Sequence, residues 1–245
     1  MTADPIRRPV SARSALLSLL LGAHPPTLPA RELLAMAELV GVSEPTARVA
    51  LSRMVATGDV RREDGAYTLN QRLLARQRRQ DAAVDPATRP WHGGWELLVV
   101  TATGRGATAR AAMRTELGEL RFGELREGVW MRPDNLVRPC PESVSAVTRR
   151  LATAPVPDAA ELAGQLWDLP GWATDGHTLL RILESTEEPA TRFAAIAMSV
   201  RHLLTDPVLP AELLPADWPG TRLRAEYQTY REWLISMRPA VATRD

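Results

Sequence analysis

The sequence contains no lysine and only one cysteine. All thirty basic residues are arginine, a bias typical of GC-rich coding and therefore no evidence of function. Cys140 stands between two prolines, and a single thiol excludes an intrachain disulfide framework and any metal site built from several thiolates. So little cysteine suits a reducing cytoplasm.

Long apolar runs are also missing. No stretch reaches the roughly eighteen apolar residues that a membrane span requires. Arg7, Arg8 and Arg13 precede an apolar run over residues 15–23, which imitates a secretory signal. The run continues directly into a helical pattern, so a first buried helix is the better interpretation. We therefore expect a soluble, cytoplasmic protein that does not contact the membrane.

Signatures of catalysis and of metal binding are absent as well. The four histidines, at positions 24, 92, 177 and 202, lie far apart in the chain and match no zinc-binding spacing. No Gly-x-Ser-x-Gly nucleophile motif occurs. We expect no catalytic residue, no metal and no cofactor, and hence a protein that is not an enzyme.

The charge is unevenly distributed. Residues 1–80 hold twelve arginines against seven acidic residues, whereas residues 81–245 hold eighteen arginines against twenty-two acidic residues. The net charge of +1 conceals this difference. A basic module joined to a mildly acidic body is consistent with a DNA-binding head on a sensing or dimerising body.

Residues 42–70 carry the most informative pattern. A helix is predicted over residues 43–57, with Ser43 as its hydroxyl cap and Gly58 as its stop. Its inward face takes Ala47, Ala50, Leu51, Met54 and Val55. The Asp64-Gly65 dipeptide then predicts a two-residue hairpin turn, because both central residues need positive φ. A recognition helix followed by a basic hairpin indicates a winged helix-turn-helix.

The polar side chains of this segment are the candidate DNA contacts. Exposed arginines are most often a solvated helix face, but the cap, the small inner face and the hairpin favour groove reading. Arg48 is expected to fork onto guanine, and short hydrogen bonds are expected from its polar neighbours. The hairpin arginines are expected to neutralise phosphates. The candidates are Ser43, Thr46, Arg48, Ser52, Arg53, Arg61 and Arg62.

The remaining pattern predicts an α+β protein in three parts. Residues 1–80 form the winged helix-turn-helix domain, residues 91–170 a ferredoxin-like α+β domain, and residues 171–245 a helical domain. In the middle part, strands are predicted at 96–102, 128–131 and 166–169 and helices at 107–120 and 142–151. Only three of the four usual strands are identified. Further helices are predicted at 11–22, 30–40, 71–80, 176–185, 189–204 and 221–237, and the linker at 81–90.

One motif leaves an alternative open. Residues 103–109 match Gly-x-Gly-x-x-Ala after an apolar strand, and Glu124 lies about where a ribose-binding acid would sit. This pattern permits a nucleotide-dependent metabolic enzyme with an appended winged-helix module. A DNA-binding protein without sequence preference is a further alternative.

Several segments together resemble the PaaX-type transcriptional regulators. The matching pieces are the segments at 11–14, 43–54, 110–117, 122–130 and 206–220, with Trp95 and its strand. The resemblance implies a homodimer on a palindromic DNA operator. It also implies a repressor of an aromatic-acid catabolic operon, such as one for phenylacetate, relieved by an aryl-coenzyme A thioester such as phenylacetyl-CoA. Arg201 and His202 are the candidate effector-binding residues.

Overall fold

The computed structural model describes residues 10–104 and 106–242, apart from the side chains of residues 238–242. Two arginines before the apolar run, Arg7 and Arg8, lie outside the described residues. So does Arg105 of the Gly-x-Gly-x-x-Ala motif. The chain forms two compact units. The first combines Met1–Val84, His177–Arg201 and Thr221–Asp245, and the second combines Asp85–Gly176 and His202–Gly220.

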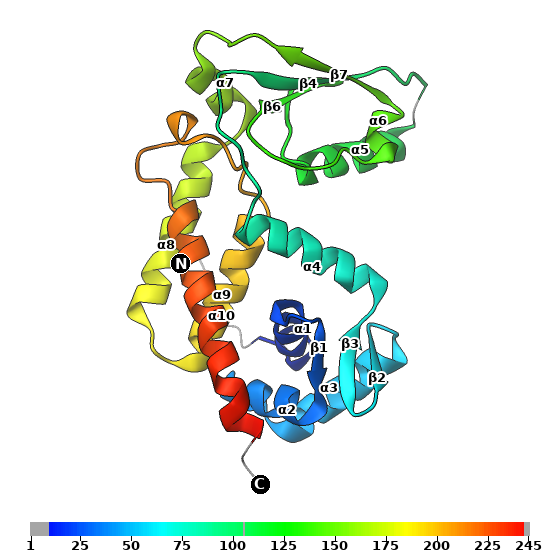
Figure 1. The fold of residues 1–245 in the computed structure, drawn as a ribbon, viewed down its shortest axis with the longest axis vertical. Helices are drawn as coiled ribbons and strands as arrows, with labels where there is room; N and C mark the ends of the chain where they lie inside the picture. Colours follow the sequence, from blue (N-terminus) through cyan, green and yellow to red (C-terminus); the bar gives the residue numbers. More distant parts are fainter. Residues whose placement is uncertain (1–9, 105, 243–245) are drawn as a thin grey trace. The chain divides into compact units, whose positions relative to one another are not determined.

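The first unit begins with three helices and a hairpin (Figure 1). Helix α1 is nearly all apolar and capped by Ser11, whose Oγ accepts a hydrogen bond from the Ser14 N–H at 3.2 Å. Helices α1, α2 and α3 pack against one another in pairs. The elements are α1 (Ala12–Gly22), β1 (Thr27–Pro29), α2 (Ala30–Leu39), α3 (Glu44–Ala56), β2 (Val60–Glu63), β3 (Ala66–Leu69) and α4 (Gln71–Val84).

The hairpin forms as the sequence predicts. Asp64 and Gly65 both have positive φ, 49° and 75°, and β2 pairs with β3 in an antiparallel register that places Arg61 opposite Thr68. Strand β1, which the sequence analysis does not identify, adds to the other edge of β3, so the sheet order is β1-β3-β2. Helices α8 (Leu169–Ser185) and α9 (Pro189–Leu203) contribute residues to both units, whereas α10 (Gly220–Ala242) lies in the first unit apart from Gly220.

The second unit is built around a four-stranded antiparallel sheet. Its strands are β4 (Trp95–Val100), β5 (Gly123–Arg126), β6 (Val129–Pro133) and β7 (Thr148–Thr153), in the order β5-β6-β4-β7. Helix α5 (Ala107–Glu119) follows β4, and the short helix α6 (Glu142–Ser145) precedes β7. The mixed α+β class is confirmed.

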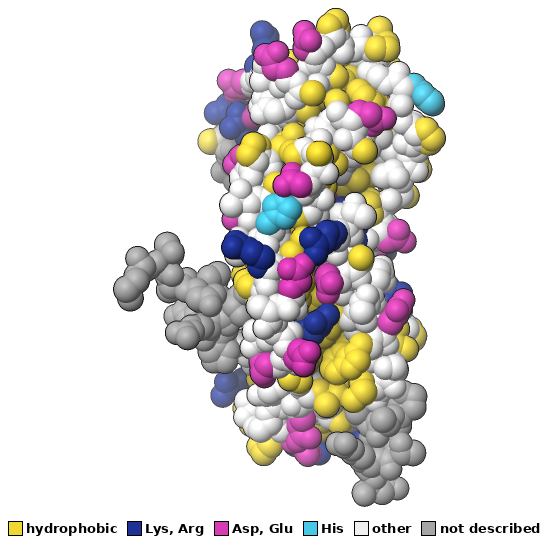
Figure 2. Space-filling model, turned by 90° about the vertical axis from the view of Figure 1, so that its left-hand side faces the viewer, with side chains coloured by type: hydrophobic (Ala, Val, Ile, Leu, Met, Phe, Trp, Pro, Cys, Tyr) yellow, Lys and Arg dark blue, Asp and Glu magenta, His cyan; other side chains and the backbone are white. Residues whose placement is uncertain are grey.

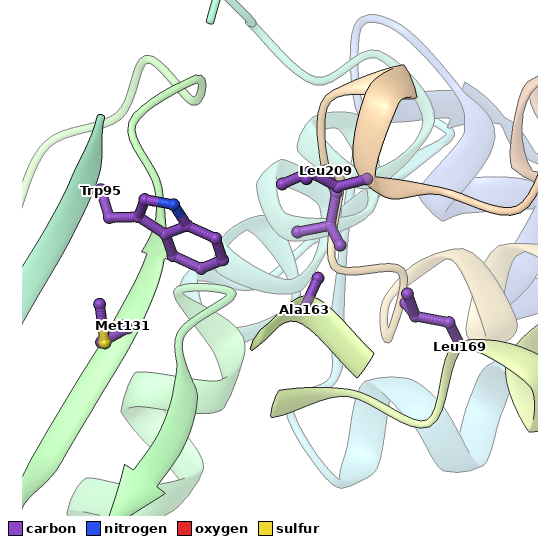
Figure 3. Close-up of a cluster of buried hydrophobic side chains, with 6 residues drawn as sticks. Trp95, Met131, Ala163, Leu169 and Leu209 are labelled. Carbon is purple, nitrogen blue, oxygen red and sulfur yellow. The ribbon is translucent and has the colours of Figure 1, made fainter. Parts of the chain in front are cut away.

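Two apolar clusters stabilise this unit. Leu98 and Trp130 of the sheet pack with Met113 and Leu117 of α5. In the second cluster, Figure 3 shows Trp95 and Met131 on their strands, with side chains of three other segments nearby. These segments are α7 (Ala159–Leu166), the start of α8 and the chain before the 3-10 helix η1 (Ala211–Leu213). They contribute Ala163, Leu169 and Leu209.

Two predicted elements are wrong. The expected helix over residues 142–151 is a single turn followed by β7, because residues 148–153 pair along their whole length with β4, and this long-range pairing overrides the local helical pattern. The expected strand over residues 166–169 is a corner between two helices. Trp167 is extended there, and Asp168 accepts a hydrogen bond from the Gly171 N–H at 2.9 Å, which caps the start of α8.

Other helix and strand boundaries differ from the predicted ones. Helix α4 continues through Val84 into the expected linker, α8 begins seven residues before the predicted position 176, and β5 is a strand that the sequence analysis missed. Within the described part of the chain, every helix is too short or too polar to cross a lipid bilayer.

Candidate nucleic-acid interface

Helix α3 is held by its turn and by its buried face. Ser43 occupies the N-cap position with extended backbone, as predicted, but its hydroxyl does not cap the helix through a backbone N–H. It lies instead 2.9 Å from the Thr46 hydroxyl. Because both hydroxyls are exposed, the pair stands at the surface where the helix begins. Gly58, with φ of 70°, ends the helix as expected.

The helix divides into a buried face and a wide exposed face. Ala47, Leu51 and Met54 are buried against the other helices. Val55 was assigned to this inner face, and that assignment is wrong, because 39% of its surface is exposed. All four candidate contacts from the body of α3, namely Thr46, Arg48, Ser52 and Arg53, are exposed.

Arg48 and Arg53 do not share one stripe. They lie five positions apart in the chain, which at about 100° per residue places them about 140° apart around the helix axis. Val49, at 54% exposure, lies inside the arc between them. An apolar side chain flanked by two guanidinium groups suits a DNA base pair, since a thymine methyl is apolar and guanine offers two acceptors. Sequence reasoning missed Val49, although plotting residues 44–56 at 100° intervals would have identified it.

Each arginine has a different local environment. The Arg48 Nε donates to Glu44 Oε1 at 2.7 Å, one helical turn earlier, and both side chains are largely exposed. Arg53 lines a shallow hollow between α1 and α3 together with Arg13 and Thr46. The structure therefore gathers Thr46 and Arg53 on one side of α3 and places Arg48 on the other.

The hairpin presents its own arginines to solvent. Arg61 and Arg62 are both exposed on β2. The Arg61 Nη1 lies 3.5 Å from Glu63 Oε1, and the Arg62 guanidinium carbon lies 5.8 Å from the centre of the Tyr67 ring. These are weak surface contacts that a phosphate can replace.

A buried carboxylate ties this surface together, and it was not identified from the sequence. Asp59, between α3 and β2, accepts hydrogen bonds from Arg13 of α1 and Arg72 of α4, both at 2.6 Å. The hydroxyl of Thr57 adds a third at 3.2 Å. The hydrogen bond from Arg13 holds the pKa of the Asp59 carboxyl below its usual range, even though burial opposes the shift. Asp59 thereby fixes the start of α1, the end of α3 and the start of α4.

Helix α4 supplies most of the positive charge of this region. Residues 43–69 hold four arginines and four acidic residues, so they contribute no net charge. Four further arginines follow on α4, at positions 72, 76, 78 and 79. By contrast, the face in Figure 2 shows Arg side chains interspersed with Asp and Glu side chains.

The two candidate effector residues, although adjacent, face different hollows. Arg201 lines an apolar cavity of the first unit. His202 lines a separate, open hollow of the second unit and stacks on Trp172, with ring centres 4.0 Å apart. Its Nε2 lies 2.9 Å from the Trp172 carbonyl oxygen, and burial lowers the pKa of the imidazole. Trp218 stacks on the same Trp172 at 4.3 Å.

The Gly-x-Gly-x-x-Ala motif of residues 103–109 forms a turn between β4 and the start of α5. Gly104 has φ of 70°, and Gly106 occupies the N-cap position of α5. Strand β4 pairs antiparallel with both of its neighbours. A dinucleotide fold requires parallel strands at this point, so the sheet around the turn is of a different kind.

Comparison with known proteins covers most of the chain. A family model described as PaaX-like protein matches residues 11–73, one for the PaaX protein central Cas2-like domain matches residues 88–157, and one for the PaaX-like protein C-terminal domain matches residues 176–240. A solved structure of an uncharacterized protein, Rv0674 from Mycobacterium tuberculosis, is 52% identical, with a TM-score of 0.83, and the match covers 95% of this chain and 99% of that one. No curated protein matches. On these matches the chain belongs to the PaaX-like family.

Proposed function

We propose that the protein is a sequence-specific DNA-binding transcriptional regulator without catalytic activity. In this proposal helices α1–α3 and the β2–β3 hairpin act as a winged helix-turn-helix, and α3 enters the major groove. Residues 1–80 bind DNA, residues 91–170 form a ferredoxin-like body, and residues 171–245 form a helical body. Membership of the PaaX-like family supports a regulatory role.

The exposed face of α3 is the observation that carries the proposal. Val49 stands between Arg48 and Arg53, nearer to Arg53, and contacts a thymine methyl group, while Arg48 forks onto a guanine on the other side. Arg53 and Thr46 contact the DNA on the side away from Arg48. Ser52 and Ser43 add short hydrogen bonds. In water the exposed Val49 side chain buries no apolar surface, whereas contact with the edge of a base pair would bury it.

Phosphate contacts come from the elements around α3. Arg61 and Arg62 on the hairpin reach one backbone, and Arg13 and Arg72 reach the phosphates beside α3 while Asp59 holds their positions. Such contacts position the protein without reading sequence. They account for the salt dependence of binding.

The active species is a homodimer that binds a palindromic operator. Two α3 helices then read successive major grooves, with half-sites about 34–36 Å apart or a multiple of that distance. By family resemblance, the protein represses an aromatic-acid catabolic operon, and an aryl-coenzyme A thioester relieves the repression. A coupling of about 1–3 kcal/mol between effector and DNA is enough for such a switch.

Selection of bound sequences from a random duplex pool tests the proposal. Full-length protein should enrich a palindromic motif. Arg48→Ala and Val49→Ala should each lose preference at one position per half-site, and the two positions should differ. Recovery of sequences without any common motif would instead indicate a non-specific architectural binder. Enrichment that both variants leave unchanged would remove α3 as the reading element.

A further inference from the structure

Helix α4 carries a row of arginines along one side. Arg72, Arg76 and Arg79 lie at i, i+4 and i+7, which places them within about 60° of one another around the helix axis. Residues 71–80 contain no acidic side chain. The helix runs from the hairpin toward the end of α9 (Figure 1), where Arg201 borders the same apolar cavity of the first unit as Arg76. We call these four arginines, two of them on the rim of one cavity, the α4 arginine strip.

The strip adjoins the exposed face of α3. Arg72 donates to Asp59 Oδ1 and Arg13 donates to the other oxygen of the same carboxylate, both at 2.6 Å. Arg13 also lines the shallow hollow between α1 and α3 together with Arg53. A continuous row of cations therefore leads from α3 past the start of α1 and along α4 to the end of α9.

The strip is short of compensating negative charge. Arg76 and Arg201 form no ion pair with any residue that the structure describes. Burial lowers the pKa of Arg76, and the neighbouring cations Arg201 and Arg79 lower it further. An exposed arginine on α10, by contrast, is paired with an acid, as Arg222 is with Glu184. Because gathering like charges costs free energy in the free protein, the arrangement favours a polyanionic partner.

We propose that the α4 arginine strip binds the phosphate backbone of the duplex beyond the base pairs that α3 reads. From Arg72 to Arg79 the strip extends about 10 Å along the helix axis, which equals the rise of about three base pairs. Arg201, expected from the sequence to bind an effector, holds a phosphate in this proposal.

The choice of duplex DNA as the partner rests on the proposed function, because the strip is continuous with the exposed face of α3. Phosphate contacts carry no sequence information. The strip therefore lengthens the DNA footprint and raises affinity without changing the motif that α3 selects.

A salt titration of the full-length protein tests the proposal by fluorescence anisotropy. For the double variant Arg76→Gln, Arg201→Gln the slope of log affinity against log salt should fall by about two per bound subunit. Between 50 and 200 mM salt, the variant should then lose roughly tenfold less affinity per bound subunit than the wild type does. The motif that it selects should be unchanged. The matched control Arg181→Gln, Arg222→Gln removes two exposed arginines outside the strip and should keep the wild-type slope.

Ethylation interference locates the contacted phosphates on the duplex. With the wild type, ethylation of about three phosphates beyond the base pairs read by α3 should weaken binding. These base pairs are defined by the positions at which Arg48→Ala loses preference. The double variant should lose the interference at the outer phosphates and keep it beside α3.

A urea titration separates binding from folding. Because Arg76 lies among like charges, Arg76→Gln should unfold at the same urea concentration as the wild type or at a higher one. The proposal is overturned if the double variant keeps the wild-type slope, if the outer interference persists in it, or if the control lowers the slope equally.

The same data distinguish this proposal from the proposed function. Selection of a motif together with an unchanged slope in the double variant would remove the strip and leave sequence-specific reading standing. A reduced slope in a protein that selects no motif would do the reverse, and would leave the strip as a surface for the DNA backbone.

Discussion

Replacing Arg48 by alanine is the perturbation whose outcome the structure defines best. In the free protein the guanidinium is paired with Glu44 on the same helix. An exposed pair at this spacing is worth about 0.3–0.5 kcal/mol, whereas a forked contact with guanine is worth about 1–3 kcal/mol of discrimination. DNA therefore competes successfully for the side chain. The net loss in Arg48→Ala is about 0.5–2.7 kcal/mol, or roughly 2- to 100-fold in affinity.

The assay is fluorescence anisotropy with the selected duplex and with duplexes altered at one base pair. Arg48→Ala should bind the selected duplex more weakly and should no longer distinguish the base at its own position. Glu44→Gln should act in the opposite direction, by roughly twofold, because it releases the arginine from its intrahelical partner.

Arg222→Ala is the matched control. Arg222 on α10 forms an equally exposed pair with Glu184 of α8, so its removal changes the net charge by the same amount outside α3. We expect wild-type affinity. The reasoning is refuted if Arg48→Ala binds as wild type does, or if it loses affinity equally for every duplex.

Three further predictions address the hairpin, the buried carboxylate and the stacked imidazole. Arg61→Ala should weaken binding to all duplexes alike and reduce the slope of log affinity against log salt by about one, as measured by salt titration. Asp59→Asn should lower the free energy of unfolding in urea by about 1–3 kcal/mol at neutral pH. Because the pKa of Asp59 is lower in the folded chain, that difference should shrink as the pH falls below about 4. The pKa of His202 is also lowered by burial, so the wild type should lose stability as the pH falls below about 6.5, and His202→Asn should flatten this dependence; equal profiles for both proteins would contradict it.

Local sequence signals were sufficient to predict helix α3 and the β2–β3 hairpin. The Asp64-Gly65 turn depends on the φ preference of two residues, and the end of α3 depends on Gly58, so neighbouring residues alone determine both. Strand β7 could not be predicted from local signals. Its six residues form a strand because β4, about fifty positions earlier, offers a paired edge, and no pattern within residues 142–153 contains that information.

The candidate site divides in the same way. Exposure of the candidate DNA contacts follows from helical spacing, and the same spacing would have placed Val49 between Arg48 and Arg53. The bonds of Asp59 to Arg13 and Arg72 join residues 46 and 13 positions apart, and sequence spacing does not indicate which arginines meet a given carboxylate. The apolar cavity that Arg201 lines could not be predicted from the sequence either, because its lining includes Gln80, Arg201 and Tyr230, which come from three separate helices.

The most direct test of the central claim compares the affinity of the full-length protein for its selected palindromic duplex with its affinity for a scrambled duplex at physiological salt. Reading by α3 predicts that the selected duplex binds at least about a thousandfold more tightly. Equal affinity for the two duplexes would contradict sequence-specific recognition by this protein.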